Sequence, residues 1–138
     1  MTKINMKRVN DKVHFRAYNS SGNIASMDGS PGIGGEGKGV RPMELLLMSM
    51  AGCSSIDIVS ILEKMRQGLE TLDVQVEGFR EEGAVPAVFT KIHIHYVLGG
   101  KLKEEKVKQA IDMSLGKYCS VSKMLEKAVE ITSSYEIV

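Results

Sequence analysis

Two cysteines are the residues of this chain best suited to chemistry, and the first has unusual neighbours. Cys53 lies in the long apolar stretch 42–62, yet the residues beside it are small: Ala51, Gly52, Ser54 and Ser55. Cys119 follows 66 positions later (119 − 53). Small neighbours leave room for a molecule to approach the sulfur, and a second thiol far along the chain favours paired cysteine chemistry. A cysteine that only packs, as a small hydrophobe, is the alternative.

The surroundings of the two thiols differ in their effect on a negative charge. On a helix, Ser49 and Asp57 share a face with Cys53, so this sulfur has more polar surroundings than an apolar core requires. Cys119 is expected at the N-terminus of the last helix, where the dipole and free N–H groups favour a thiolate. We therefore predict Cys119 to be the more acidic thiol. Cys53 needs a cation from another element, and the sequence leaves three candidates open: Arg8, Arg16 and Arg41.

Length and composition restrict the class of protein. With 138 residues, the chain makes one domain and has no room for a second core. Its 18 basic and 17 acidic residues give a net charge of +1, so nothing electrostatic indicates nucleic acid or a membrane surface. Residues 1–8 lack the apolar core of a signal peptide. We expect a cytoplasmic protein, in which a disulfide between the cysteines is transient and part of a redox cycle.

The pattern of apolar and polar residues predicts the elements that position the thiols. In chain order, they are strands 4–9, 12–18 and 23–28, a glycine-rich loop 29–41, a helix 42–67, strands 71–79 and 88–98, helices 102–115 and 120–128, and a strand 129–137. Gly68 is expected to end the first helix, Gly99 and Gly100 to break the strand before them, and Gly116 to end the second helix. Because strands come in runs, an α+β architecture with antiparallel sheet is favoured.

These elements form a single predicted domain, 1–138, in five parts. They are the N-terminal strands with the glycine-rich loop (1–41), the central helix (42–67), two long strands (71–98), two helices (102–128) and the final strand (129–138).

The central helix is apolar almost all round in its first half. Such a helix must be covered on every side, and 138 residues barely provide the cover. Burial against a second copy in a homodimer is therefore expected. The stretch 42–62 is also long enough to cross a membrane, but Asp57 near its centre is strongly penalised there. We expect a buried helix and no membrane span.

Two further patterns do not indicate ligand sites. Residues 32–38 match glycine-rich nucleotide-binding strings, but Gly39 stands where a phosphate loop needs Ser or Thr, and the helix starts too late for a dinucleotide fingerprint. A flexible loop bordering a site is expected over 29–41 instead. His93 and His95 share one face of a strand, yet only one other histidine exists and a zinc site needs three or four ligands. We expect two solvent-facing histidines and no metal.

Three segments together resemble the OsmC-like (osmotically inducible protein C) family. They are residues 35–53, 117–122 and 135–138, which include both cysteines and the end of the chain. The resemblance covers essentially the whole chain. The residues around Cys53 and around Cys119, taken together, are a specific signal of this family. It implies an intertwined homodimer in which long cysteine-bearing helices pack centrally between two antiparallel sheets, with active sites at the subunit interface.

The resemblance also implies an activity, because members of this family are thiol-dependent peroxidases, notably the organic hydroperoxide resistance branch. Cys53 would be the peroxidatic thiolate, which an organic hydroperoxide oxidises to a sulfenic acid. Cys119 would be the resolving thiol, and a dithiol or lipoyl-type reductant would reset the disulfide. This implies an antioxidant role in oxidative stress that uses no metal, haem or flavin.

The start of the central helix departs from the pattern of the peroxidase branches. There a Pro-Glu pair opens the helix, and its Glu pairs with an Arg beside the reactive sulfur. Here Met43 follows Pro42 and Glu44 comes one place later, about 180° around an ideal helix from Cys53. Glu44 is thus the candidate supporting residue only with a local adjustment, in a subgroup with a Pro-Met-Glu start. A non-catalytic dimer that binds a small molecule or senses thiol oxidation is the alternative.

Overall fold

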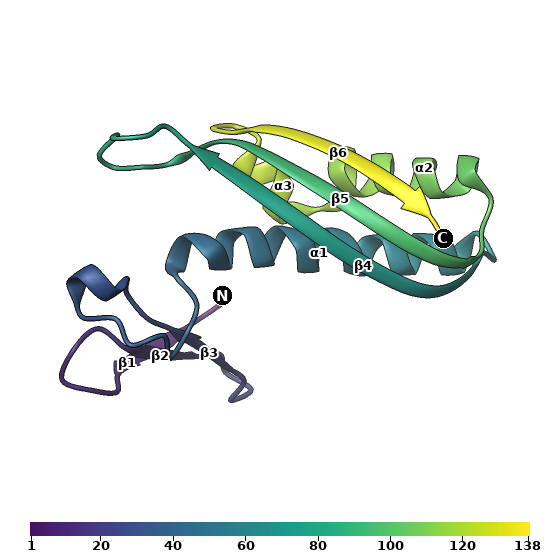
Figure 1. Ribbon diagram of the computed structural model, residues 1–138. Helices are drawn as coiled ribbons and strands as arrows, with labels where there is room; N and C mark the ends of the chain where they lie inside the picture. The colour runs from purple at the N-terminus through teal and green to yellow at the C-terminus, as the bar shows by residue number, and fades with distance from the viewer. The chain divides into compact units, whose positions relative to one another are not determined.

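The computed structural model describes residues 1–138 and divides into two compact units, Met1–Leu46 and Leu47–Val138 (Figure 1). The smaller unit holds strands β1 (Asn5–Arg8), β2 (Phe15–Tyr18) and β3 (Ile24–Met27) and the short 3-10 helix η1 (Pro31–Ile33). The larger unit holds most of helix α1 (Pro42–Lys64), strands β4 (Gly68–Arg80) and β5 (Phe89–Lys101), helix α2 (Glu104–Met113), the π-helical turn η2 (Ser114–Tyr118), helix α3 (Ser120–Leu125) and strand β6 (Glu130–Ile137).

The smaller unit is built on an antiparallel sheet of order β1-β2-β3. Asn10 shapes the turn after β1, because its side-chain oxygen accepts the N–H groups of Lys12 (3.0 Å) and His14 (3.1 Å). This is the use of asparagine that favours turns. The three predicted strands are confirmed, each shorter than expected.

The glycine-rich stretch 29–41 was expected to be a flexible loop, but the structure organises it around a buried aspartate. Asp28 is 1% exposed, and its carboxylate accepts the backbone N–H groups of Gly29 (2.8 Å), Glu36 (2.9 Å) and Lys38 (3.1 Å). These bonds hold the pKa of Asp28 below its ordinary value, with the Glu36 amide as the largest cause. The backbone of Val40 also pairs with Ser26 and Asp28. The stretch is therefore a loop with its own hydrogen bonds, and its predicted flexibility stays a prediction.

The larger unit has a second sheet of order β4-β5-β6, in which β4 and β5 are antiparallel but β5 and β6 are parallel. The expectation of antiparallel pairing throughout was therefore wrong at β6. The chain between β5 and β6 contains α2, η2 and α3, and a crossover of this kind returns the next strand in the same direction. The α+β fold class is confirmed, and one face of β5 is fully buried as its alternation predicts: Ile92, Ile94, Tyr96 and Leu98.

Glycines do not end the elements where the sequence indicated. Helix α1 ends at Lys64, and the reversal uses Arg66 in a left-handed conformation (φ 56°), while Gly68 begins β4. Gly100 lies inside β5 at φ 130°, where a side chain would meet the Gly68 carbonyl oxygen, so it allows a close strand approach with a register shift. Gly116 lies inside η2 instead of stopping the helix.

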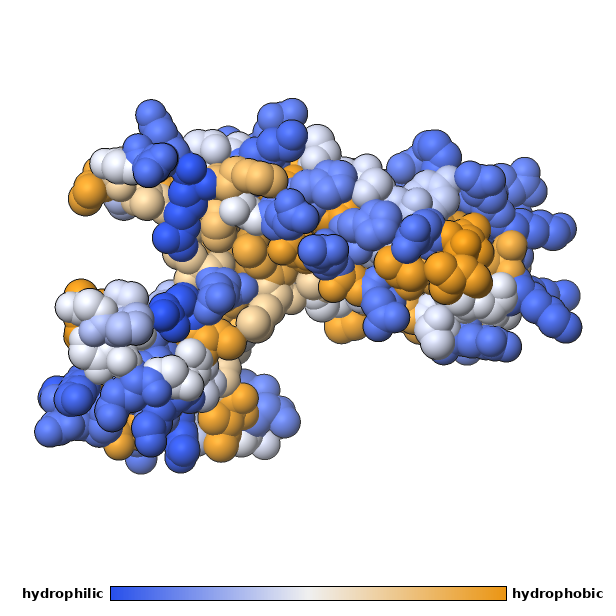
Figure 2. Space-filling view, in the orientation of Figure 1, coloured by the Kyte–Doolittle hydropathy of each residue, from blue (hydrophilic) through white to orange (hydrophobic).

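Helix α1 buries one side and leaves apolar residues open on another. Met50, Ile58 and Leu62 are fully buried, whereas Ile56 and Val59 are 72% and 45% exposed. Figure 2 shows apolar residues, in orange, among hydrophilic ones on the visible face of the larger unit. By length and composition, α1 also resembles a membrane span, with 22% of its most apolar part buried within the chain. A core helix of a soluble protein passes the same test.

Candidate functional site

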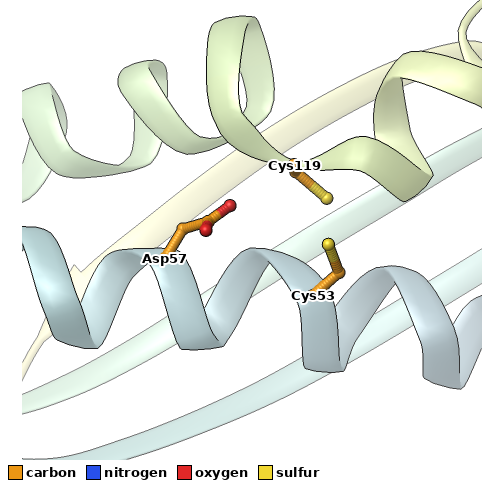
Figure 3. A group of neighbouring side chains, drawn as sticks. All are labelled: Cys53, Asp57 and Cys119. Carbon is orange, nitrogen blue, oxygen red and sulfur yellow. The ribbon is translucent and has the colours of Figure 1, made fainter.

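Three side chains that are distant in sequence converge in the larger unit. Cys53 and Asp57 project from α1, and Cys119 projects toward them from the segment between η2 and α3 (Figure 3). Both sulfurs and a carboxylate oxygen of Asp57 lie within 4.8 Å of one another. Cys53 and Asp57 are four residues apart on a helix and therefore share one face, as their spacing predicts. The structure thus brings the two thiols together.

The π-helical turn is what carries Cys119 to α1. The N–H of Cys119 donates to the Ser114 carbonyl at 2.7 Å, five residues back, which widens the helix by one residue before α3 begins. Cys119 is then the N-cap of α3, and its sulfur accepts the backbone N–H of Ser122 at 3.4 Å. The predicted position at a helix N-terminus is therefore confirmed. Turns of this kind are frequent at functional sites.

The acidity predicted for Cys119 was wrong, because burial outweighs the helix terminus. The Cys119 side chain is fully buried. Its desolvation raises the pKa of the Cys119 thiol above its ordinary value, and the neighbouring Cys53 adds to the shift. The hydrogen bonds from Ser122 act in the opposite direction but are the smaller effect. Cys53 is only partly buried, so it is the thiol that a molecule from solution can reach.

A hydroxyl network lies beside the thiols and involves residues that the sequence analysis did not select. The Tyr96 hydroxyl donates to Ser54 Oγ at 2.7 Å, and burial raises the pKa of Tyr96 to about 12. Ser114 Oγ lies 3.1 Å from the Ser54 carbonyl oxygen and 3.2 Å from Asp57 Oδ2. Tyr96 and Ser114 are fully buried. The one signal for them in the sequence was the position of Tyr96 on the buried face of β5.

A pocket of about 300 Å³ borders the thiol pair through Asp57. Its lining, from α1 and the segment around η2, is mainly apolar and consists of Asp57, Ser60, Ile61, Lys64, Met65, Met113 and Tyr118. Small-molecule sites are typically apolar hollows with a few polar groups that orient the ligand. The Asp57 carboxylate thus faces both the pocket and the two sulfurs.

Glu44 and the candidate arginines have other contacts in the smaller unit. Glu44 Oε1 accepts the backbone N–H of Arg41 at 2.8 Å, which is how a glutamate at the third helical position caps a helix N-terminus. The Arg8 guanidinium donates to the carbonyls of Asp11 and Lys12 in its own hairpin. Arg16 lines a separate hollow with Glu36 and other residues of the smaller unit. The activating role of an arginine stays a prediction.

The two strand histidines pair with hydroxyls of the neighbouring strand. His93 contacts Thr132 Oγ1 (2.7 Å) and Ser134 Oγ (2.9 Å), and His95 Nδ1 contacts the same Ser134 hydroxyl (2.7 Å). Both histidines are partly buried. Three of their four ring nitrogens thus contact hydroxyls across the β5–β6 pair. That the two histidines bind no metal stays a prediction.

Comparison with known proteins agrees with this fold. The model of the family described as OsmC-like protein matches residues 35–134. Protein YhfA of Escherichia coli K12 is 46% identical over 125 residues, which is 90% of each chain.

Solved structures extend the likeness to the whole fold. A hypothetical protein from Aquifex aeolicus VF5 is 31% identical with a TM-score of 0.87, over 100% of this chain and 96% of that one. An organic hydroperoxide resistance protein OsmC from Legionella pneumophila has 16% identity and a TM-score of 0.73, over 99% and 96% of the two chains, which shows a shared fold. This chain belongs to the OsmC-like family.

Proposed function

We propose that this protein is a thiol-dependent peroxidase that reduces small organic hydroperoxides with the Cys53–Cys119 pair. The single observation behind this proposal is the convergence of the two sulfurs within 4.8 Å, one reachable and one sealed. A disulfide has an S–S length of about 2 Å, so the two sulfurs need to approach by less than about 3 Å to form it. Family membership supports the same chemistry.

The reaction proceeds in three steps. The Cys53 thiolate attacks the distal oxygen of ROOH, the O–O bond breaks, and the alkoxide leaves and takes a proton to become ROH. Cys53 is then a sulfenic acid, and Cys119 attacks its sulfur, so that the disulfide forms and water leaves. An external dithiol or lipoyl-type reductant restores both thiols by exchange.

Access and burial support the two proposed roles. The attacking thiol must meet the hydroperoxide, and Cys53 is the partly exposed member of the pair. Cys119 is fully buried and its pKa is raised, so it is protected from solution oxidants and reacts with the sulfenic acid next to it. The apolar pocket beside Asp57 suits the organic group of the hydroperoxide. Glu44 acts mainly as a helix cap in this account.

We further propose that the active form is a homodimer in which α1 packs against its copy. The apolar side chains exposed on α1, Leu46, Met48, Ile56 and Val59, are the observation behind this. Ile56→Lys should weaken dimerisation at least about thirtyfold, the loss expected of an interface hot spot. Analytical ultracentrifugation measures this, with Met124→Lys on α3, an apolar residue about as exposed as Ile56, as the control. A monomeric wild-type protein at all concentrations contradicts the proposal.

Free thiols that must be reset after each turnover suit the cytoplasm, where dithiol reductants are maintained. We place the protein there, without a nucleic-acid or membrane partner.

Peroxide turnover tests the proposed activity. Purified protein with a dithiol should consume tert-butyl or cumene hydroperoxide, and Cys53→Ser should lower kcat/KM at least about a thousandfold, as loss of a nucleophile does. Ser55→Ala, two residues along α1 and also partly buried, is the matched control and should keep activity. Cys119→Ser should accumulate the sulfenic acid, which a dimedone-type reagent traps. Cys53→Ser protein that turns over like wild type ends the proposal.

A binding or sensing dimer is the second candidate, and the pocket beside Asp57 favours it. In that case the thiols oxidise once without repeated turnover, and a small apolar molecule copurifies with the protein. Native mass spectrometry detects such a molecule, while multiple turnovers with any dithiol exclude this candidate.

A further inference from the structure

The reduced thiol site has the donor set of a metal centre. Two sulfurs and a carboxylate oxygen, from Cys53, Cys119 and Asp57, lie mutually within 4.8 Å. Figure 3 shows all three side chains turned toward a common space between α1 and the η2–α3 segment. This group is distinct from the strand histidines His93 and His95.

We propose that the reduced protein binds one zinc-like divalent cation per chain through Cys53 Sγ, Cys119 Sγ and an Asp57 carboxylate oxygen. This concerns the same thiol pair as the proposed peroxidase. Thiolates select cations of this type, and three protein ligands with an open fourth position are the usual set of a reactive zinc site.

The dimensions agree with such a site. Tetrahedral zinc with Zn–S bonds of about 2.3 Å places two sulfur ligands roughly 3.8 Å apart. The donor atoms, all within 4.8 Å, need to close by roughly 1 Å or less, which side-chain rotation on rigid helices provides. Cys53 and Asp57, four apart on α1, form one side of the site, and Cys119 closes the other.

Neighbouring groups already orient two of the three ligands. Ser114 Oγ contacts Asp57 Oδ2 at 3.2 Å, which leaves the second carboxylate oxygen for the cation. The Ser122 N–H donates to Cys119 Sγ at 3.4 Å. Hydrogen bonds of this kind fix the ligands of metal sites and tune their affinity. Because Cys53 and Asp57 are only partly buried, the fourth position is open toward solution.

Binding would protect the thiols, and oxidation would release the cation. Loading replaces the thiol protons, so two thiolates and one carboxylate surround the cation. When an organic hydroperoxide oxidises the site, the thiolates give two electrons and form the S–S bond. The O–O bond takes these electrons and two protons, leaving ROH and water, and the cation loses both sulfur ligands. The bound cation would thus protect the reduced thiols, and oxidation of the thiols would release it. Cation binding would in this way regulate the proposed peroxidase.

Cadmium titration of reduced, chelator-washed full-length protein tests the proposal. Sulfur-to-cadmium charge-transfer absorption should rise to an end point of one cation per chain, and competition with a chromophoric chelator gives the zinc affinity. Cys53→Ser and Cys119→Ser should each remove most of the charge-transfer signal. Asp57→Asn should weaken zinc affinity by at least about tenfold, the smallest loss typical of groups that support a metal site. Asp73→Asn, an exposed aspartate on β4, is the matched control and should bind as wild type.

The outcomes separate this proposal from the peroxidase. Asp57→Asn protein that binds zinc as tightly as wild type overturns the three-ligand site, as does a wild-type end point far below one cation per chain. Peroxide turnover is measured separately on metal-free protein with chelator present. A metal-free protein without turnover that still binds cadmium through all three residues contradicts only the peroxidase. Turnover without stoichiometric binding contradicts only the metal site.

Discussion

Asp28 in the smaller unit and Asp57 in the larger unit are both shielded carboxylates, but their surroundings have opposite consequences. Asp28 accepts three backbone N–H groups and ties the glycine-rich loop to the end of β3. Asp57 accepts one serine hydroxyl and otherwise faces two thiols and a pocket. A carboxylate whose oxygens all accept backbone N–H groups stabilises the local fold. A carboxylate with few hydrogen-bond donors and with thiols beside it can take part in binding or catalysis.

The largest effect expected from this comparison is at Asp28. Asp28→Asn removes the charge that strengthens three amide hydrogen bonds, so exchange of the Gly29, Glu36 and Lys38 amides should speed up about tenfold or more. Hydrogen exchange followed by NMR measures this. Asp57→Asn is the control, because the Asp57 carboxylate accepts a serine hydroxyl and no backbone N–H in this structure. Unchanged protection of these amides in Asp28→Asn would falsify the structural role.

The same aspartate predicts a pH dependence. Its pKa is lowered in the fold, so its contribution to stability is present above the ordinary value of 3.8 and is lost as pH falls through the lower folded value. The loop amides should therefore lose protection in acid, below about pH 4. Asp28→Asn should show no such acid step. A loop equally protected at all acid pH values contradicts the assignment.

The hydroxyl network beside Asp57 is expected to give a smaller effect. Tyr96→Phe removes the donor to Ser54 Oγ in a fully buried position, which should lower the free energy of unfolding by about 1 kcal/mol. Urea denaturation measures this. Because the pKa of Tyr96 is about 12, the variant should also lack the most alkaline step of the tyrosinate absorbance titration. Tyr18→Phe in β2 is the control.

The smallest effect is expected from the charge of Asp57 itself. A carboxylate beside a sulfur disfavours a second negative charge, so Asp57→Asn should raise the rate of Cys53 alkylation roughly threefold at neutral pH. Iodoacetamide labelling followed by mass spectrometry measures this rate at Cys53, the partly exposed thiol. Asp73→Asn should leave it unchanged. Slower labelling of Cys53 in Asp57→Asn reverses the proposed electrostatics.

Local pattern predicted most elements of this fold. Alternation of apolar residues indicated a strand at β5, and the spacing of Cys53 and Asp57 placed them on one side of α1, because both features depend on backbone periodicity alone. The helix N-terminus at Cys119 was likewise predictable, and the OsmC-like resemblance connected the two cysteines.

Tertiary effects account for what the sequence did not predict. The parallel pairing of β6 depends on where the crossover helices pack. The π-helical turn that positions Cys119 continues through Gly116, which was expected to end the helix. The pKa of Cys119 was predicted in the wrong direction because burial, which the helix-end argument omits, is the largest cause. Tyr96 was recognisable only as a member of the apolar alternation of β5, and Ser114 had no signal in the sequence.

The direct test of the central claim is to oxidise reduced protein with one equivalent of tert-butyl hydroperoxide per chain and map its cysteines by non-reducing mass spectrometry. We expect a peptide pair joined by a Cys53–Cys119 disulfide, with neither thiol left for alkylation. Oxidation that stops at a Cys53 sulfenic acid, while Cys119 remains fully alkylatable after unfolding, contradicts the proposed pairing.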